Sequence, residues 1–374
     1  NKTGEPIHIV ENLNDSMEAD KIVNLISKNT SLGEYDFSDF VILYRTNAQS
    51  RIIEDKLRRQ GIPYHIIGGV KFYERKEIKD MLGYLKIMSN PSDNVSLLRV
   101  LNFPARGIGK TSIEKIINNS KKQKTSIFKV LENIDKVEIG QSQKKTIKMF
   151  IDNINKIQNK IDTYNMVDLI NDLIEKFKIK EHYDKQNTSD SNERWQNIEE
   201  LVNGIIDYDN EKEDPKLVTF LEEVSLLTDI DKWNDEVKQV TLMTVHSSKG
   251  LEFPIVFIAG LEEGLFPISQ YLDQNDELEE ERRLFYVGAT RAMDKLYLSY
   301  SKLRRRFGAE VMSMTVSRFI NELPDGNIDY IRPKNEFNFS SKTVLKDIKY
   351  KKGQLVYHSL FGKGKIIDVE GEGN

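Results

Sequence analysis

The fold of this chain is decided by the stretch VTLMTVHSSKGLEFPIVFIAGLEEG at residues 240–264. It opens with an apolar run typical of a buried strand, breaks into a polar loop from Thr244 to Gly250, and resumes as a second apolar run from Pro254 to Ala259. Hydroxyl groups and a Lys-Gly pair in such a loop place hydrogen-bond donors where a phosphate or a nucleotide could bind. We therefore expect two buried strands joined by a polar, ligand-facing loop.

A second informative stretch, EEERRLFYVGATRAM at residues 279–293, lies further along the chain. Its charged and apolar residues fall at helical spacing up to Arg291, which predicts an amphipathic helix that ends at this arginine. The two stretches together make the polar loop a stronger candidate for a binding site than the loop would be alone.

The composition indicates a multidomain protein without a membrane-spanning segment. A chain of 374 residues is too long for one ordinary core, so we expect two or more domains. Charged residues make up 30% of the chain, and no apolar run approaches the roughly 18 residues of a transmembrane helix. The lack of cysteine excludes disulfides and thiolate metal sites and agrees with a cytoplasmic location. With a net charge of −4, any nucleic-acid binding must depend on local basic patches.

Strand and helix signals alternate through the first part of the chain, residues 1–67. Thr46 and Gln49 predict a capping box at the start of a helix, and Asp15 with Glu18 resembles a looser one. Strand-helix-strand spacing of this kind predicts a parallel, doubly wound sheet. The segments, in order, are PIHIVENL, SMEADKIVNLISKN, DFVILYRT, AQSRIIEDKLRRQ and IPYHIIGG.

The pattern changes to long amphipathic helices over residues 68–238 and returns to strands over residues 239–332. The apolar stripes of the helices predict an ordinary helical core. We therefore expect an α/β fold in which one parallel sheet uses residues 1–67 and 239–332, with a mostly helical domain inserted between them. Residues 333–374 read as a linker followed by the beginning of a small β-barrel.

Residues 98–112, LRVLNFPARGIGKTS, imitate a phosphate-binding P-loop through Gly109, Lys110 and Thr111. A P-loop needs a glycine where this chain has Pro104, which has no N–H group and a fixed φ. The same residues are better explained by a helix-hairpin-helix type of turn at 106–112. Exposed N–H groups of Gly107-Ile108-Gly109, with Arg106, Lys110 and Thr111, would hold a DNA phosphate without reading sequence. An ordinary glycine turn remains the alternative.

Two further features carry less weight. Gly260 and Leu261 separate the strand that precedes them from the acids that follow, which argues against a Mg²⁺ site there, and we expect no metal site in this chain. The triplet Arg304-Arg305-Arg306 suggests DNA contact, but a solvated run of charges is the simpler interpretation.

Four motifs resemble the second motor half of superfamily-one DNA helicases of the UvrD/Rep type, and the resemblance covers nearly the whole chain. It implies a RecA-like domain 2A, an inserted helical domain 2B and a truncated Tudor-like tail. The motifs are YRTNAQSR (44–51), GGVKFYERKEIKD (68–80), TVHSSKGLEFPIVFIAGLEEGLFP (244–267) and EEERRLFYVGATRA (279–292).

The resemblance assigns roles to individual residues. Arg291 would be the arginine finger on the γ-phosphate of ATP, because a planar guanidinium can neutralise charge that grows in the transition state. Glu252 would accept a hydrogen bond from a ribose hydroxyl, and Gly250 would lie beside the nucleotide. An ion pair between Arg291 and a nearby acid is the structural alternative.

Other residues are implied to contact DNA. Thr244, His246 and Lys249 would lie between the nucleotide and the DNA, and Phe72 with Arg75 would stack on a base and contact a phosphate. Structural alternatives exist for three of these residues, namely a satisfied strand-end histidine for His246, a solvated Lys249 and core packing for Phe72.

The first motor half, 1A/1B, with its P-loop and Mg²⁺-binding acids, is absent from this sequence, which begins with Asn and reads as a fragment. The resemblance implies ATP and Mg²⁺ as cofactors of the full-length enzyme, with neither bound tightly by this chain. It also implies 3′ to 5′ polarity and three partners: single-stranded DNA with its duplex junctions, the missing half, and RNA polymerase through the tail. A self-contained NTPase using Gly109-Lys110-Thr111 and a non-catalytic DNA-binding or adaptor module are the competing hypotheses.

Overall fold

The computed structural model describes residues 4–161, 163–230, 238–268, 275–306, 310–324 and 326–332, and the strands Leu355–His358 and Gly362–Lys365. The chain divides into two compact units, Asn1–Arg332 and Pro333–Asn374. In the second unit, β9 (Leu355–His358) and β10 (Gly362–Lys365) form an antiparallel pair. The remainder of the predicted tail lies outside the described residues.

One sheet organises the first unit, and it takes strands from both sides of the helical segment. Its order is β3-β4-β2-β5-β6-β1-β8, with every neighbouring pair along this path parallel, while β7 pairs antiparallel with β6. The α/β fold with a RecA-like parallel sheet is therefore confirmed. The strands are β1 (Ile7–Asn14), β2 (Phe40–Tyr44), β3 (Tyr64–Ile67), β4 (Val240–Thr244), β5 (Phe253–Ile258), β6 (Ala292–Arg306), β7 (Glu310–Ser313) and β8 (Ile328–Ile331).

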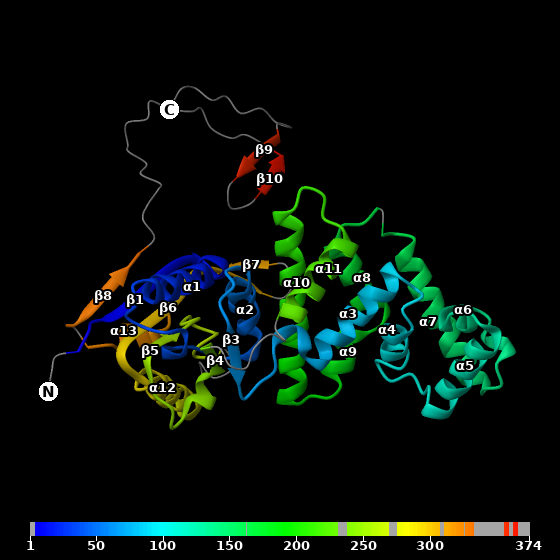
Figure 1. Ribbon diagram of the computed structural model, residues 1–374, viewed down its shortest axis with the longest axis horizontal. Helices are drawn as coiled ribbons and strands as arrows, with labels where there is room; N and C mark the ends of the chain where they lie inside the picture. Colours follow the sequence, from blue (N-terminus) through cyan, green and yellow to red (C-terminus); the bar gives the residue numbers. More distant parts are fainter. Residues whose placement is uncertain are drawn as a thin grey trace. The chain divides into compact units, whose positions relative to one another are not determined.

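The central strand β2 reads FVILY because both faces of the sheet are covered, and all five of its residues are buried. Successive side chains alternate between the faces, so Ile42 packs in one apolar cluster and Leu43 in another. Helices α1 (Asp15–Ser31) and α2 (Ser50–Arg59) contribute to the first cluster, and α12 (Asn275–Ala289) with the short α13 (Arg318–Asn321) to the second (Figure 1).

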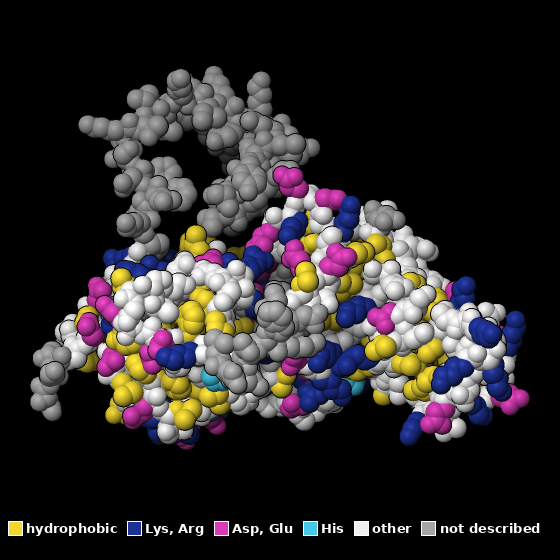
Figure 2. Space-filling view, viewed as in Figure 1, with side chains coloured by type: hydrophobic (Ala, Val, Ile, Leu, Met, Phe, Trp, Pro, Cys, Tyr) yellow, Lys and Arg dark blue, Asp and Glu magenta, His cyan; other side chains and the backbone are white. Residues whose placement is uncertain are grey.

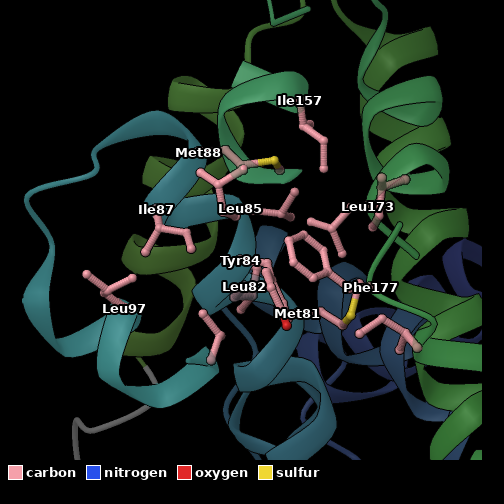
Figure 3. Close-up of a cluster of buried hydrophobic side chains, with 14 of the residues drawn as sticks. Met81, Leu82, Tyr84, Leu85, Ile87, Met88, Leu97, Ile157, Leu173 and Phe177 are labelled. Atoms are coloured by element: carbon pink, nitrogen blue, oxygen red, sulfur yellow. The ribbon is translucent and has the colours of Figure 1, made fainter. Parts of the chain in front are cut away.

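The described residues between Ile67 and Val240 form helices, 3₁₀ turns and loops, with one extended apolar core. Figure 3 shows this core around Tyr84 and Phe177, with Met81, Leu85 and Leu173 directed toward them. The helices are α3 (Lys76–Ser89), α4 (Asn94–Val100), α5 (Lys110–Gln123), α6 (Ile127–Glu132), α7 (Gln141–Gln158), α8 (Met166–Lys176), α9 (Ile179–Asp184), α10 (Ser189–Glu211) and α11 (Leu217–Ile230). None of the helices in the described part of the chain is long and apolar enough to cross a membrane.

Helix α10 connects this helical segment to the sheet. The guanidinium of Arg51 on α2 donates to Glu200 at 2.6 Å and to Asp207 at 3.0 Å, both on α10. Gly204 permits this approach, because a Cβ at that position would lie 3.1 Å from Nη1 of Arg51. The buried guanidinium therefore joins α2 and α10 through charge-assisted hydrogen bonds.

Two of the predicted local features have different outcomes. The capping box at Thr46 is confirmed, because Oε1 of Gln49 accepts from the N–H of Thr46 at 2.9 Å. The looser box at Asp15 is wrong, because Asn14 caps α1 by accepting from the N–H of Met17. Glu18 is instead a buried residue of α1 and forms an ion pair with an arginine that is distant in the chain.

That distant arginine is Arg304, and its position corrects the interpretation of the arginine triplet. Arg304 and Arg305 lie near the end of the 15-residue strand β6, where Arg304 is buried and Arg305 is partly buried. Arg304 is buried between Glu18 and Glu262, with N–O distances of 2.5 to 2.8 Å, and Arg305 pairs with Asp207. Neither a solvated run nor a DNA contact describes these two side chains.

Candidate functional site

The polar loop runs back across one face of the sheet. Strand β4 ends at Thr244, a 3₁₀ turn covers Val245–Ser248, and β5 begins at Phe253. Both strands are parallel to β2, so the loop must return from the end of one strand to the beginning of the other. The turn packs against α12, and Gly250, with φ at +82°, adopts a left-handed conformation that favours glycine.

Arg291 lies at the rim of the sheet, directly before β6. Its guanidinium donates to the carbonyl of Val287 from Nε and to the carbonyl of Leu251 from Nη1, both at 2.9 Å, and to Oγ1 of Thr290 at 3.1 Å. The carbonyl of Arg291 also accepts from the N–H of Phe253 at 2.9 Å. The structure therefore brings Arg291 against the loop residue that lies between Gly250 and Glu252.

The surroundings of Arg291 remain open to a ligand. Gly250 and Glu252 are exposed, and the Arg291 side chain is partly exposed. No carboxylate forms an ion pair with Arg291 among the residues that the structure describes, so the structural alternative of a nearby acid is not observed there. Within the same part of the chain, no group of three His, Asp or Glu side chains could hold a metal ion.

The loop also carries His246 and Lys249, both exposed, and Thr244, which is half-buried and hydrogen-bonded to Ser247 at 3.0 Å. Partial desolvation lowers the pKa of His246, and the positive charges of Arg45 and Lys249 lower it further. The imidazole is therefore neutral at pH 7. It can serve as a hydrogen-bonding group there.

Arg45 is a site residue that the sequence interpretation missed. It follows the last residue of β2, and its guanidinium contacts the carboxylate of buried Glu281 on α12 at 2.6 to 3.0 Å. The signal was the arginine at the end of DFVILYR, where a buried strand delivers a charged side chain to its edge. A second guanidinium therefore lies close enough to affect the titration of His246.

We expect the substitution Arg45→Gln to raise the pKa of His246. The variant removes a positive charge and leaves the carboxylate of Glu281 uncompensated, and both changes favour the imidazolium. NMR titration of the histidine ring protons measures this shift. His65 is the internal control, because burial and Lys71 lower its pKa, and its value should not change.

The pH dependence of stability follows from the same shift. A histidine whose folded pKa lies below its unfolded value loses stability as the pH falls through about 6.5. The Arg45→Gln variant should therefore lose less stability from His246 over that range than the wild type does. An unchanged His246 titration in the variant would show that Arg45 does not act on this ring.

Phe72 and Arg75 are not available to DNA. Phe72 is 0% exposed in the core of the helical segment, so its predicted stacking role is wrong and core packing is correct. Arg75 is 8% exposed and donates to Ser50, Asn47 and Asn197 at 2.7 to 2.9 Å. Its predicted phosphate contact is wrong because these donations leave the guanidinium engaged inside the protein.

The turn at 106–112 lies between helices α4 and α5, and its Arg106 does not have the predicted role. The Arg106 guanidinium folds inward, donating to the carbonyl of Phe103 and to the hydroxyl of Tyr84, both at 2.6 Å. It also lies over the rings of Phe150 and Phe177. The DNA-phosphate role predicted for the Arg106 side chain is therefore wrong, because the side chain fixes the turn from within.

The remaining hairpin residues point outward. Gly107, Gly109, Lys110 and Thr111 are exposed, and α5 begins at Lys110 with Gly109 as its N-cap. The preceding element is helix α4 rather than a strand of the sheet, which is incompatible with a P-loop. The Gly109-Lys110-Thr111 NTPase hypothesis therefore has no support in the structure.

Three features of the structure can be compared with known proteins. They are a parallel sheet interrupted by a helical segment, a polar loop that joins two of its strands, and an arginine held beside that loop. Residues 1–303 match the family model of the UvrD-like helicase C-terminal domain. The chain belongs to this family. The resemblance that the sequence motifs carry to UvrD-like helicases is thus confirmed.

Relatives of this UvrD-like domain include three proteins named ATP-dependent DNA helicase PcrA. The Bacillus subtilis (strain 168) protein is 36% identical over 398 residues, covering 100% of this chain and 54% of that protein. The Staphylococcus aureus (strain Mu50) and Staphylococcus epidermidis proteins are each 35% identical, covering 99% of this chain and 53% of theirs. The chain spans about half the length of these relatives.

Proposed function

We propose that this chain is the second motor half, domains 2A and 2B, of an ATP-dependent DNA helicase. The observation that carries the proposal is the Arg291 guanidinium, held by protein oxygens beside the loop with its outer edge open. Family membership and relatives named as ATP-dependent DNA helicases support it. Polarity of 3′ to 5′ is part of the proposal and comes from the family resemblance alone.

ATP and Mg²⁺ are the cofactors that we propose for the complete enzyme. Arg291, Glu252 and Gly250 would face the nucleotide, and ATP would supply the phosphoryl group whose hydrolysis drives movement. The exposed carboxylate of Glu252 and the unobstructed backbone at Gly250 fit this role. We propose that this chain alone binds neither cofactor tightly, because the P-loop cradle would come from the 1A/1B half.

The proposed DNA partner is single-stranded DNA and its junction with duplex. Figure 2 shows lysine and arginine side chains gathered over the end of the helical segment, although the whole chain carries a net charge of −4. Exposed Lys110 and Thr111 at the start of α5 would contact phosphate there. The buried Ile108 of the same turn would not take part, because its N–H already donates to Oδ1 of Asn102 at 3.1 Å. We also propose RNA polymerase as a partner that binds residues 333–374, as the family resemblance implies.

The hairpin's role is tested by Lys110→Ala, which should weaken duplex-junction binding several-fold and reduce the slope of log affinity against log salt by about 1. Lys122→Ala is the matched control, because it removes an exposed lysine from the opposite end of the same helix. Fluorescence anisotropy at several salt concentrations measures both variants. If both variants show the same DNA affinity and the same salt dependence, the hairpin has a structural role and does not contact DNA.

A non-catalytic DNA-binding or adaptor module is the competing proposal. Such a module would keep the salt-dependent DNA affinity and would make Arg291 dispensable. Measuring ATP turnover therefore distinguishes the two proposals, whereas measuring DNA binding does not.

A further inference from the structure

The residue before Arg291 is a threonine whose hydroxyl proton is already used in a hydrogen bond. Thr290 follows the last residue of α12, and its Oγ1 donates to the carbonyl of Val287 at 2.9 Å. A hydroxyl has one proton, so this bond leaves only lone pairs to face other groups. The Nη2 of Arg291 donates to that oxygen at 3.1 Å. The hydroxyl therefore acts as a fixed acceptor for the guanidinium.

Three acceptors fix the plane of the guanidinium. The Val287 and Leu251 carbonyls accept from Nε and Nη1, and Thr290 accepts from Nη2. A guanidinium carries five N–H donors, so one N–H remains on each terminal nitrogen. Two of the acceptors are main-chain atoms, which leaves Thr290 as the side chain that sets the orientation of Nη2.

The base of this arrangement is rigid. Gly288, in the last turn of α12, is buried, and a Cβ there would lie 3.0 Å from Cγ1 of Val245 and 3.2 Å from Cδ1 of Ile258. The helix end therefore packs closely on the loop and on β5. Acceptors held on such closely packed elements can hold a catalytic group within the small tolerance that chemistry requires.

We propose that Thr290 is a positioning residue that orients the Arg291 guanidinium for its contact with the transferring phosphoryl group. This inference rests on the proposed function. Without the Thr290 acceptor, Nη2 would lose one of its partners, and the planar guanidinium could reorient as a unit about the Cδ–Nε bond. A misoriented guanidinium would stabilise the negative charge that develops on the phosphoryl group less strongly, although ATP could still bind.

The test uses the complete ATPase that contains this chain, with Thr290→Val, Thr290→Ser and the matched control Thr146→Val. Thr146 makes the same kind of bond, from its hydroxyl to the carbonyl of Ser142 on α7. We expect Thr290→Val to lower kcat about 10- to 100-fold with little change in KM for ATP. Thr290→Ser and Thr146→Val should keep wild-type turnover, and thermal unfolding checks that every variant is folded.

A double-mutant cycle separates positioning from an ordinary structural role. If Thr290 acts through Arg291, then Thr290→Val should have no further effect in an Arg291→Ala background. A further loss of turnover in that background, or wild-type kcat in Thr290→Val alone, would overturn the inference while leaving the proposed function in place. Unchanged turnover in Arg291→Ala would instead overturn the proposed function itself.

Discussion

Replacing Arg304 with alanine should lower the free energy of unfolding by about 3–5 kcal/mol. The guanidinium is buried between Glu18 of α1 and Glu262, the acid that follows β5, and it donates to both carboxylates. Removing it leaves two carboxylates without their counterion in a site that water does not reach, and burial is expensive for an unpaired charge. Urea unfolding followed by circular dichroism measures the change.

The Arg304→Ala defect should also depend on pH in a defined direction. Burial already raises the pKa of Glu262, and Arg304 opposes that rise. Without the arginine the folded pKa rises further above its unfolded value, so the folded state takes up protons and gains stability as the pH falls. The variant should therefore lose less stability at pH 5.5 than at pH 8.

Two controls distinguish a buried ion cluster from a general loss of charge. Arg59→Ala removes an exposed arginine that pairs with exposed Glu211, and it should cost about 1 kcal/mol or less. The triple variant Glu18→Gln, Glu262→Gln, Arg304→Met removes all three charges together and should recover much of the lost stability. A defect in Arg304→Ala no larger than that in Arg59→Ala would contradict the buried role.

The sheet could be predicted from the sequence because its signal is local. Runs such as FVILY and FPIVFI are apolar at every position, which is what a strand covered on both faces requires. The return of such runs after residue 239 is enough to indicate that one sheet is built from two segments. The register, with β4 inserted between β3 and β2, is a tertiary property and needed the structure.

The arginines could not be placed in the same way, because their partners are remote in the chain. Arg304 reads as part of a surface run until Glu18 and Glu262 are brought against it. Arg75 and Arg106 lie in motifs suggestive of phosphate contact, yet Asn197 and Tyr84 engage them inside the protein. Residue type and spacing indicate charge, whereas burial decides whether that charge faces a ligand.

Arg291 is the exception, since it lies beside the polar loop with its side chain partly exposed, as a ligand-facing arginine requires. We expect Arg291→Ala in the complete enzyme to lower ATP turnover by about 10³-fold or more, which is the effect of removing an arginine finger. The guanidinium would act on charge that develops only in the transition state, so nucleotide binding should change far less than kcat. Arg283→Ala is the matched control, because Arg283 is an exposed arginine on α12 paired with Glu280.

The DNA-stimulated ATPase rate of the Arg291→Ala enzyme, measured beside its affinity for a non-hydrolysable ATP analogue, tests the assignment of this chain as a motor half most directly. The predicted result is turnover reduced about 10³-fold with analogue affinity largely retained and with Arg283→Ala close to wild type. Near-normal turnover in Arg291→Ala would contradict the assignment.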